Sequence, residues 1–449
     1  MAPLPDELTN GPAAGTSTEN TRLRILLVGT RILPFRHGGD KNFWLDMIRG
    51  LIGQGHEVQV LSLMLDPLPP SDLPIRRIES VPVYLRPDQR FNPEYRYLAG
   101  TNNYASRTAS LPRIVQEVRQ QLREFRPDVV HFADNYGPAM IGLRAACGQV
   151  PLTISAPTYY RTSRLYDLFL QASFSSFNVI VPFSDAYRQR LLELGIPPER
   201  VRRIRWGIDV DRLSPPSPAE RSAARIKLGL DDGQFVVMWT GFLQQTNVAD
   251  LQTALRTAEF ALEHGPPGLV FLFCLKPEHY QESLKRFERP RLQVFGSAEL
   301  FHAAVGSADL LLSPIQDTRS TAAPPLAWLE CLAKGIPILT TDVPGTGEAV
   351  LPGVSGFAVH DQPEAGKRLL EIAEDPTLHR RLRDGARQVA VERYSTTRAL
   401  REYVDLWSRL AIAPRARPAS MARWKSSGPW RSETTTTGAG PSDDPLAKR

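Results

Sequence analysis

Two adjacent glycines stand where a backbone could approach a negatively charged ligand. Gly38 and Gly39 follow the short apolar run 24–30 and precede a helical pattern. Glycine allows close approach of the backbone, and the free N–H groups at a helix N-terminus favour anions. The pair is therefore a candidate phosphate-binding turn, and a tight turn without a ligand is the alternative interpretation.

Residues suited to binding a phosphorylated molecule follow apolar runs in the second half of the chain. Lys276 comes directly after the run 269–275, and Arg319 and Thr321 lie in a polar crossing before the helix that contains Glu330. Lysine and arginine bind phosphate oxygens, and Thr321 precedes a helix N-terminus. The alternatives are a solvated loop lysine for Lys276 and a solvated helix-face carboxylate for Glu330.

A single histidine ends another apolar run and is a candidate for contact with a substrate. His131 closes the run 129–132, although a hydrogen-bonded histidine of structural role is the common alternative. The sequence shows no Ser-His-Asp order, no paired carboxylates at catalytic spacing and no cluster of metal ligands. Hydrolytic and metal-dependent chemistry therefore have no support, and we expect neither a cofactor nor a metal.

The elements that carry these residues alternate in the manner of a parallel α/β protein. The predicted strands are 24–30, 57–61, 129–132, 152–155, 179–181 and 201–206, then 235–239, 269–275, 292–295, 310–312 and 336–339. The predicted helices between and after them are 43–51, 114–125, 186–194, 249–262, 300–305, 326–333, 364–374, 378–391 and 396–410. Ligands of such sheets bind beyond the carboxyl ends of the strands, so we expect the site in a cleft between two domains.

Changes in composition predict the domain boundaries. We expect a disordered N-terminus, a domain for the acceptor, a domain for the donor, a crossover helix and a disordered basic tail, at 1–21, 22–213, 214–395, 396–412 and 413–449 respectively. The segment 213–219, rich in proline and serine, is predicted to be the linker between the domains.

Composition excludes several classes of protein. With 449 residues, 42% of them hydrophobic and 23% charged, the chain can form two ordinary cores. No apolar run reaches the length of a membrane helix, and three distant cysteines fit a reducing, cytoplasmic location. The net charge of +6 has no Lys/Arg block that would indicate nucleic acid. Tryptophans among the arginines of the tail suggest peripheral contact with the inner face of a membrane, and a solvated tail is the alternative.

Several motifs occur in an order that resembles the family 4 glycosyltransferases. These are Pro127-Asp-Val-Val-His131, Gly207-Ile-Asp-Val-Asp211, Leu329-Glu-Cys-Leu-Ala-Lys-Gly-Ile-Pro337 and Gly345-Thr-Gly-Glu348. The resemblance runs from about residue 22 to 412, and the stretch from Leu329 to Glu348 is its specific part. It implies the GT-B fold, with two Rossmann-like parallel-sheet domains and a C-terminal helix that crosses back onto the first domain.

The resemblance also implies an activity and roles for individual residues. The activity is transfer of a sugar, with retention, from a nucleotide sugar to an acceptor hydroxyl of a glycan, a lipid-linked molecule or a small molecule. Glu330 matches the second acid of the E-x7-E motif, which binds the ribose hydroxyls of the donor. Gly38 and Gly39 would face the diphosphate, Glu348 would also contact the donor, and His131 is the candidate on the acceptor side.

The chain departs from the family where the donor phosphates should bind. Ala322 replaces the first acid of the E-x7-E motif, and Phe242 and Asn247 replace the two cations that clamp the diphosphate. We expect Lys276 and Arg319 to supply the missing charge. The alternatives are a different donor or a protein that kept the fold, lost catalysis and serves as a nucleotide-sugar-binding partner.

Overall fold

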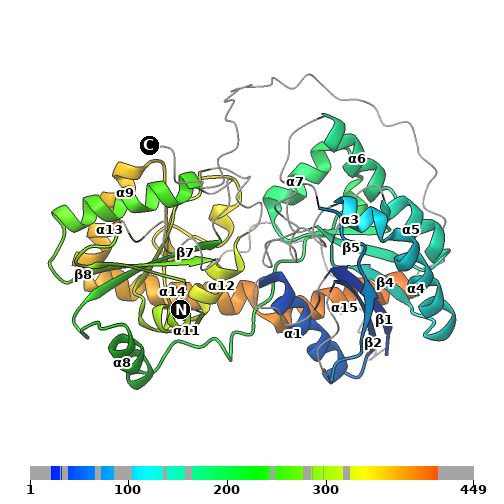
Figure 1. The fold of residues 1–449 in the computed structure, drawn as a ribbon, viewed down its shortest axis with the longest axis horizontal. Coiled ribbons are helices and arrows are strands. Elements are labelled where there is room, and N and C mark those ends of the chain that lie inside the picture. Colours follow the sequence, from blue (N-terminus) through cyan, green and yellow to red (C-terminus); the bar gives the residue numbers. More distant parts are fainter. Residues whose placement is uncertain are drawn as a thin grey trace. The chain divides into compact units, whose positions relative to one another are not determined.

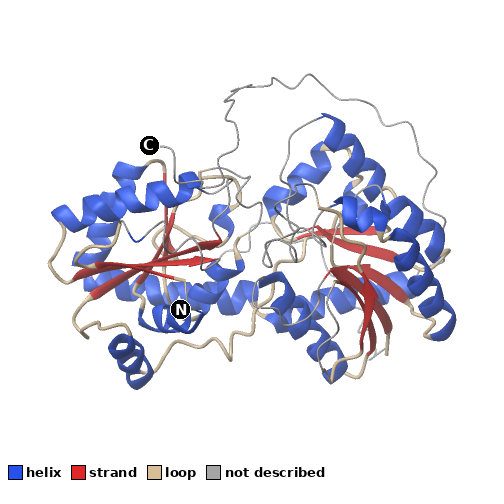
Figure 2. Cartoon of the chain, viewed as in Figure 1, coloured by secondary structure: helices blue, strands red, loops and turns tan. Residues whose placement is uncertain are grey.

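The computed structural model describes residues 22–30, 32, 39–65, 72–84, 104–134, 139–156, 164–242, 248–276, 285, 287–296, 298–316 and 324–412. These residues form two compact units. The N-terminal unit contains the described residues up to Val210 and those from Val391 on, and the C-terminal unit runs from Asp211 to Ala390. Each unit has helices on both faces of a twisted sheet (Figure 1 and Figure 2).

The N-terminal unit has a six-stranded sheet in the order β3-β2-β1-β4-β5-β6, and every pairing is parallel. Its strands are β1 (Arg24–Thr30), β2 (Glu57–Met64), β3 (Ile75–Glu79), β4 (Val129–Phe132), β5 (Leu152–Ala156) and β6 (Val179–Pro182). The central strands are buried along their length, which explains their nearly continuous apolar sequences.

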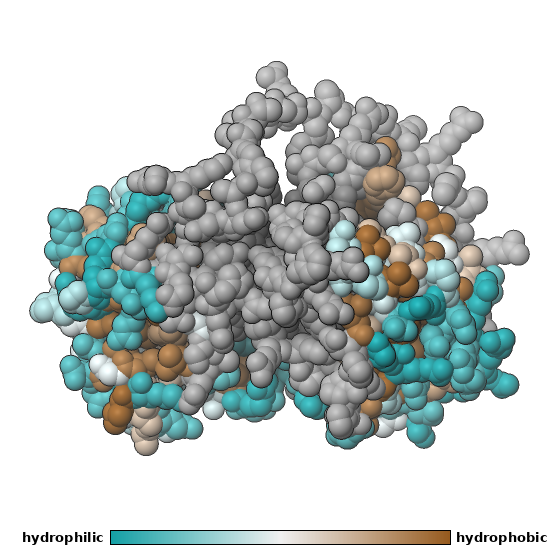
Figure 3. Space-filling model, viewed as in Figure 1, coloured by the Kyte–Doolittle hydropathy of each residue, from teal (hydrophilic) through white to brown (hydrophobic). Residues whose placement is uncertain are grey.

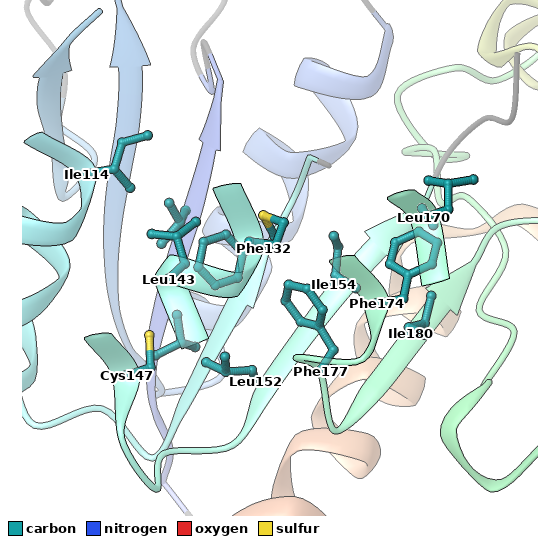
Figure 4. Packing of buried hydrophobic residues seen from close by; sticks show 14 of the residues in the cluster. Ile114, Phe132, Leu143, Cys147, Leu152, Ile154, Leu170, Phe174, Phe177 and Ile180 are labelled. Atoms are coloured by element: carbon teal, nitrogen blue, oxygen red, sulfur yellow. The ribbon is translucent and has the colours of Figure 1, made fainter. Parts of the chain in front are cut away.

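Helices cover both faces of this sheet. They are α1 (Gly39–Gly53), α3 (Tyr104–Ala109), α4 (Leu111–Glu124), α5 (Ala139–Cys147), α6 (Arg164–Phe174), α7 (Asp185–Glu193) and α15 (Thr396–Ile412), with a short 3-10 turn η2 (Pro198–Arg200). Side chains of α4 to α7 pack on one face of the sheet, where Phe132, Phe174 and Phe177 fill the core (Figure 4). The C-terminal helix α15 packs against α1 and β4, so it is part of the N-terminal unit.

The C-terminal unit repeats the same plan with the strand order β12-β11-β10-β7-β8-β9. Its strands are β7 (Phe235–Phe242), β8 (Leu269–Lys276), β9 (Leu292–Phe295), β10 (Leu310–Ser313), β11 (Ile338–Thr341) and β12 (Gly356–Val359). Its helical segments are α8 (Pro218–Lys227), α9 (Val248–His264), α11 (Ala298–Ser307), α12 (Leu326–Ala333), η3 (Thr346–Glu348), α13 (Gln362–Glu374) and α14 (Pro376–Tyr394), the last of which ends beyond the unit boundary. All of these strands pair in parallel.

A buried ionic cluster fastens the first helix of this unit to its sheet. Arg225 of α8 donates to Asp309 Oδ2 at 2.9 Å, and Arg221 donates to Asp309 Oδ1 at 2.6 Å. Asp309 also accepts from the backbone N–H of Val236, and its carbonyl lies 2.9 Å from Nε2 of His379 on α14. Through its carboxylate and its carbonyl, Asp309 therefore joins α8, the start of β7 and α14.

The structure contains elements that the sequence analysis did not predict, namely β3, β12, α3, α5 and α6, and it differs from the expectations in two connections. Residues 201–206 are not a full strand: a single bridge links Val201 to Ile180, although the segment continues in extended form along β6. The predicted linker 213–219 was wrong in its last two residues, because α8 starts at Pro218. A capping box between Ser217 and Glu220 stabilises that start, and the composition of the segment concealed it.

Exposed apolar side chains occur on two neighbouring helices of the N-terminal unit. Ile141 of α5 and Leu168 and Phe169 of α6 are each between 45% and 55% exposed. Figure 3 shows brown surface where Figure 1 places α6. In the described part of the chain, no helix is both long and apolar enough to cross a bilayer.

Candidate functional site

The strand order locates the edge of each sheet at which a ligand should bind. In the N-terminal unit the direction of strand addition reverses between β1 and β4, and in the C-terminal unit it reverses between β7 and β10. Ligands of open parallel sheets bind outside the carboxyl ends of the strands at such a reversal. The segments that follow these four strands are therefore the candidate ligand-binding segments.

Three of the residues predicted to bind the donor follow strands of the C-terminal sheet. Lys276 is the last residue of β8 and lies in register with Phe242, the last residue of β7. Glu330 lies on α12, which is the next helix after β10, and Glu348 ends the 3-10 turn η3 after β11. Since the strands are parallel, all three follow carboxyl ends at the same edge of one sheet.

A buried tryptophan fixes the helix that carries Glu330. Trp328 is 1% exposed, and its Nε1 donates to Ser313 Oγ, at the end of β10, over 2.8 Å. The carbonyl of Ser313 in turn accepts from Thr340 Oγ1 of β11 at 2.8 Å. These bonds tie α12 to two strands at the reversal point, and Glu330, two residues after Trp328, is half-buried there.

An aspartate bridges across the reversal point in each unit. In the N-terminal unit, Asp134, which follows β4, accepts from the backbone N–H of Thr30 at the end of β1, over 2.5 Å. In the C-terminal unit, Asp250 in the first turn of α9 accepts from the backbone N–H of Gln316 at 2.8 Å. Both aspartates are buried, and neither was predicted from the sequence. An acidic residue one or two positions past a short buried strand could have drawn attention to Asp134.

The turn that presents Glu348 has a defined backbone. Gly345 has a φ of 99°, a left-handed conformation that favours glycine, and Thr346 is buried beside it. The hydroxyl of Thr346 donates to the carbonyl of Val343 at 2.8 Å. Glu348 is half-buried at the end of this turn.

His131 occupies the interior of the N-terminal unit. Its ring is fully buried, with Nδ1 2.8 Å from Thr153 Oγ1 and Nε2 3.0 Å from Ser155 Oγ. The network continues from Ser155 to the hydroxyl of Tyr403 and from Thr153 to Nε1 of Trp407, both on α15. Burial lowers the pKa of His131 to about 3, so the ring is neutral near pH 7.

The position of His131 matches the structural alternative. The ring is packed against Trp44 of α1 and against Tyr403 and Trp407 of α15, with centroid distances from 4.8 to 5.4 Å. Because no part of the residue is exposed, it cannot contact an acceptor from this position. Its observed role is to join α15 to β4 and β5.

Several predicted site residues lie outside the described residues. Gly38, Arg319 and Thr321 are among them, as are the departures Asn247 and Ala322. Gly39 begins α1 in the N-terminal unit. The tail 413–449, for which we predicted contact with a membrane, is also outside, so that contact stays a prediction.

Comparison with known proteins agrees with this two-unit arrangement. Residues 37–212 match the family model "Glycosyltransferase Family 4", and residues 234–375 match the model "Glycosyl transferases group 1". The chain belongs to the family 4-like glycosyltransferases with the GT-B fold. The two matches cover most of the N-terminal and C-terminal units respectively, so the family assignment holds for both.

Curated relatives of this chain support the family assignment, each over about half of its length. A D-inositol 3-phosphate glycosyltransferase from Saccharomonospora viridis is 29% identical over 245 residues, which is 50% of this chain and 54% of that protein. The chain thus spans about half the length of the curated relatives it matches. Sucrose-phosphate synthase from Thermosynechococcus elongatus has a TM-score of 0.69 at 16% identity, over 87% of this chain and 99% of that one.

A solved structure with a bound nucleotide shares the fold. HepE from Anabaena, crystallised with UDP and glucose, has a TM-score of 0.63 at 16% identity, over 86% of this chain and 100% of that chain. At this identity the likeness shows the fold, and the ligands belong to that protein.

Proposed function

We propose that this chain transfers a sugar, with retention, from a nucleotide-sugar donor to an acceptor hydroxyl. The observation that carries the proposal is the placement of Glu330. It is half-buried on α12, a helix that Trp328 fixes to the end of β10, at the strand reversal where ligands of such sheets bind. The family membership and the UDP complexes of a protein with the same fold support a nucleotide sugar as the donor.

In this proposal the C-terminal unit holds the donor. One carboxylate at Glu330 accepts hydrogen bonds from two ribose hydroxyls, and such charge-assisted bonds are short and strong. Lys276 and Arg319 supply positive charge to the diphosphate. They take over the task of the two family cations whose positions are occupied by Phe242 and Asn247 in this chain. Glu348 contacts the donor from the turn after β11.

The reaction breaks the bond between the sugar and the diphosphate and forms a bond from the sugar to the acceptor oxygen, while the proton of the acceptor hydroxyl passes to an oxygen of the departing diphosphate. Negative charge develops on the departing diphosphate, so cations and helix N-termini aimed at it lower the barrier. The N–H groups at the start of α1, which begins at Gly39, are suited to this task. We assign the charge stabilisation to these protein groups, without a metal.

The other candidate is a nucleotide-sugar-binding partner protein without catalysis. The replacement of three motif residues by Ala322, Phe242 and Asn247 favours it. Turnover separates the two candidates, whereas nucleotide binding does not. The test is incubation of the full chain with UDP-, GDP-, ADP- and TDP-sugars, without acceptor, and measurement of the nucleoside diphosphate released.

A further inference from the structure

An arginine-rich cluster lies at the ligand-binding edge of the N-terminal sheet. The segment 201–206 extends alongside β6, with the backbone N–H of Ile204 donating to the carbonyl of Pro182, the last residue of β6. Arg203 and Arg205 therefore lie at the carboxyl end of β6, where both pair with Asp185 in the first turn of α7. Ligands of parallel sheets bind on this carboxyl side, and β6 is the outermost strand there, two strands from the reversal between β1 and β4.

The first turn of α15 brings a third arginine to the same place. Gly207 is packed so tightly that a Cβ atom there would come within 2.7 Å of Thr396 Cα, and Ile208 forms a bridge with Ser395. Arg398 follows two residues after Thr396 and pairs with Glu402 at 2.7 Å. Burial lowers the pKa of Arg398; Glu402 opposes this shift and the nearby charge of Arg205 adds to it.

The positive charges of this cluster exceed the negative ones, and Arg205 makes the longest of the three ion pairs. The cluster holds three guanidinium groups, of Arg203, Arg205 and Arg398, against the two carboxylates of Asp185 and Glu402. Arg205 reaches Asp185 over 3.4 Å, longer than a good charge-assisted bond. Its side chain is 11% exposed, and its buried Nε has no hydrogen-bond acceptor among the described residues.

Burial of these guanidinium groups costs free energy unless a further hydrogen-bond acceptor pairs with their unused N–H groups. A buried guanidinium with unused donors loses its hydration without full compensation. A phosphate-type oxyanion offers several acceptor oxygens and suits the planar fork of arginine. It would also balance the surplus charge.

We propose that Arg205 and Arg398 bind a phosphate-type oxyanion at the carboxyl end of β6. If the proposed function holds, we assign this oxyanion to a phosphate group of the acceptor, because the cluster lies in the N-terminal unit, the expected acceptor domain. The acceptor class is then a phosphorylated molecule, such as a sugar or polyol phosphate.

The first experiment measures binding of inorganic phosphate and of glycerol 3-phosphate to the full chain by calorimetric titration. The variants are Arg205→Gln, Arg398→Gln and the conservative Arg205→Lys. Arg202→Gln is the matched control, because Arg202 lies in the same segment but pairs with Asp405 of α15 at 3.0 Å. We expect Kd for both ligands to rise about ten-fold in the two Gln variants of the cluster, less in Arg205→Lys, and to stay unchanged in the control.

Three outcomes would overturn the site or its assignment. Absence of phosphate binding by the parent chain, or equal weakening in Arg202→Gln, would show that the cluster is structural. A parallel loss of UDP affinity in Arg205→Gln would assign the cluster to the donor. If Arg205→Gln does not fold, Arg398→Gln gives the same comparison. These titrations measure binding and do not depend on turnover. A negative result would therefore disprove the oxyanion site without testing the proposed transferase activity.

Discussion

In the proposed function, Glu330 is the residue on which donor binding should depend most. We predict that Glu330→Gln weakens nucleotide-sugar binding by about 1.5–3 kcal/mol, because a neutral amide replaces the charged acceptor of two hydroxyls. Calorimetric titration with the donor measures the loss. The melting temperature should stay the same, since the substitution keeps the size of a half-buried side chain.

An exposed glutamate provides the matched control for this variant. Glu374 ends α13 on the surface of the same unit, so Glu374→Gln should leave both affinity and melting temperature unchanged. Unchanged donor affinity with a lower melting temperature in Glu330→Gln would show that Glu330 is structural.

Lys276 and Arg319 should act on the phosphates alone. We predict that Lys276→Ala and Arg319→Ala each lower kcat/KM ten-fold or more, about 1.4 kcal/mol of transition-state stabilisation. Binding of the bare nucleoside should hardly change, because it lacks the phosphates. Parental turnover in both single variants and in the double variant would rule out this compensation.

The burial of His131 makes the stability of the N-terminal unit depend on pH. The folded state keeps the ring neutral down to a pKa of about 3, whereas the unfolded chain protonates it near 6.5. The unfolded state therefore binds more protons between these values. The contribution of His131 is complete above pH 6.5 and falls as the pH drops from there toward 3.

The measurement compares the parent with His131→Gln by urea unfolding at pH 7 and pH 5. Other titrating groups are common to both chains and cancel in the comparison. We expect the variant to lose less stability than the parent on acidification, whatever its stability at pH 7. Equal losses in the two chains would mean that His131 is not held neutral in the folded state.

A motif led to the prediction of Glu330 from the sequence, and the structure places this residue on α12 beside the end of β10, while its role in donor binding stays a prediction. Asp134 and Arg205 were missed, because their roles arise from contacts with Thr30 and Asp185 that are distant in sequence. His131 was identified as a polar residue at a strand end, yet only the packing of α15 over it shows that it is inside.

Of the contacts that join elements of the C-terminal unit, we expect the ionic cluster around Asp309 to contribute most to the stability of that unit. We predict that Asp309→Asn destabilises this unit by about 3–5 kcal/mol, because it leaves the buried cation of Arg225 without its charged partner. Urea unfolding followed by circular dichroism measures the loss. Asp232→Asn is the control: Asp232 is exposed, and we expect a change within about 0.5 kcal/mol. A similar small change in Asp309→Asn would contradict the importance of the cluster.

The elements could be predicted where a buried parallel strand or an amphipathic helix fixes the pattern. The run 269–275 is an example, since β8 has a neighbour on each side and its side chains are buried. The segment 201–206 instead places arginines between its apolar residues and pairs along β6 at one bridge, and the tertiary context decides its form. The helix α8 was missed because prolines and serines surround its start.

For the whole molecule, the strand order is the same in the two units. Composition and periodicity indicate parallel sheets but do not determine this order. Both sheets have the order 3-2-1-4-5-6 when each is numbered from its own first strand. Alternating strands and helices predict parallel sheets, but the position of the reversal depends on which strands pair. That position determines where the ligand-binding segments lie.

The most direct test of the proposed transferase is release of nucleoside diphosphate from UDP-, GDP-, ADP- and TDP-sugars by the full chain without acceptor. We predict slow, saturable release from one nucleotide class, and a lower rate at subsaturating donor in Glu330→Gln. Absence of release from every donor, with nucleotide binding retained, would contradict the enzyme and favour the partner protein.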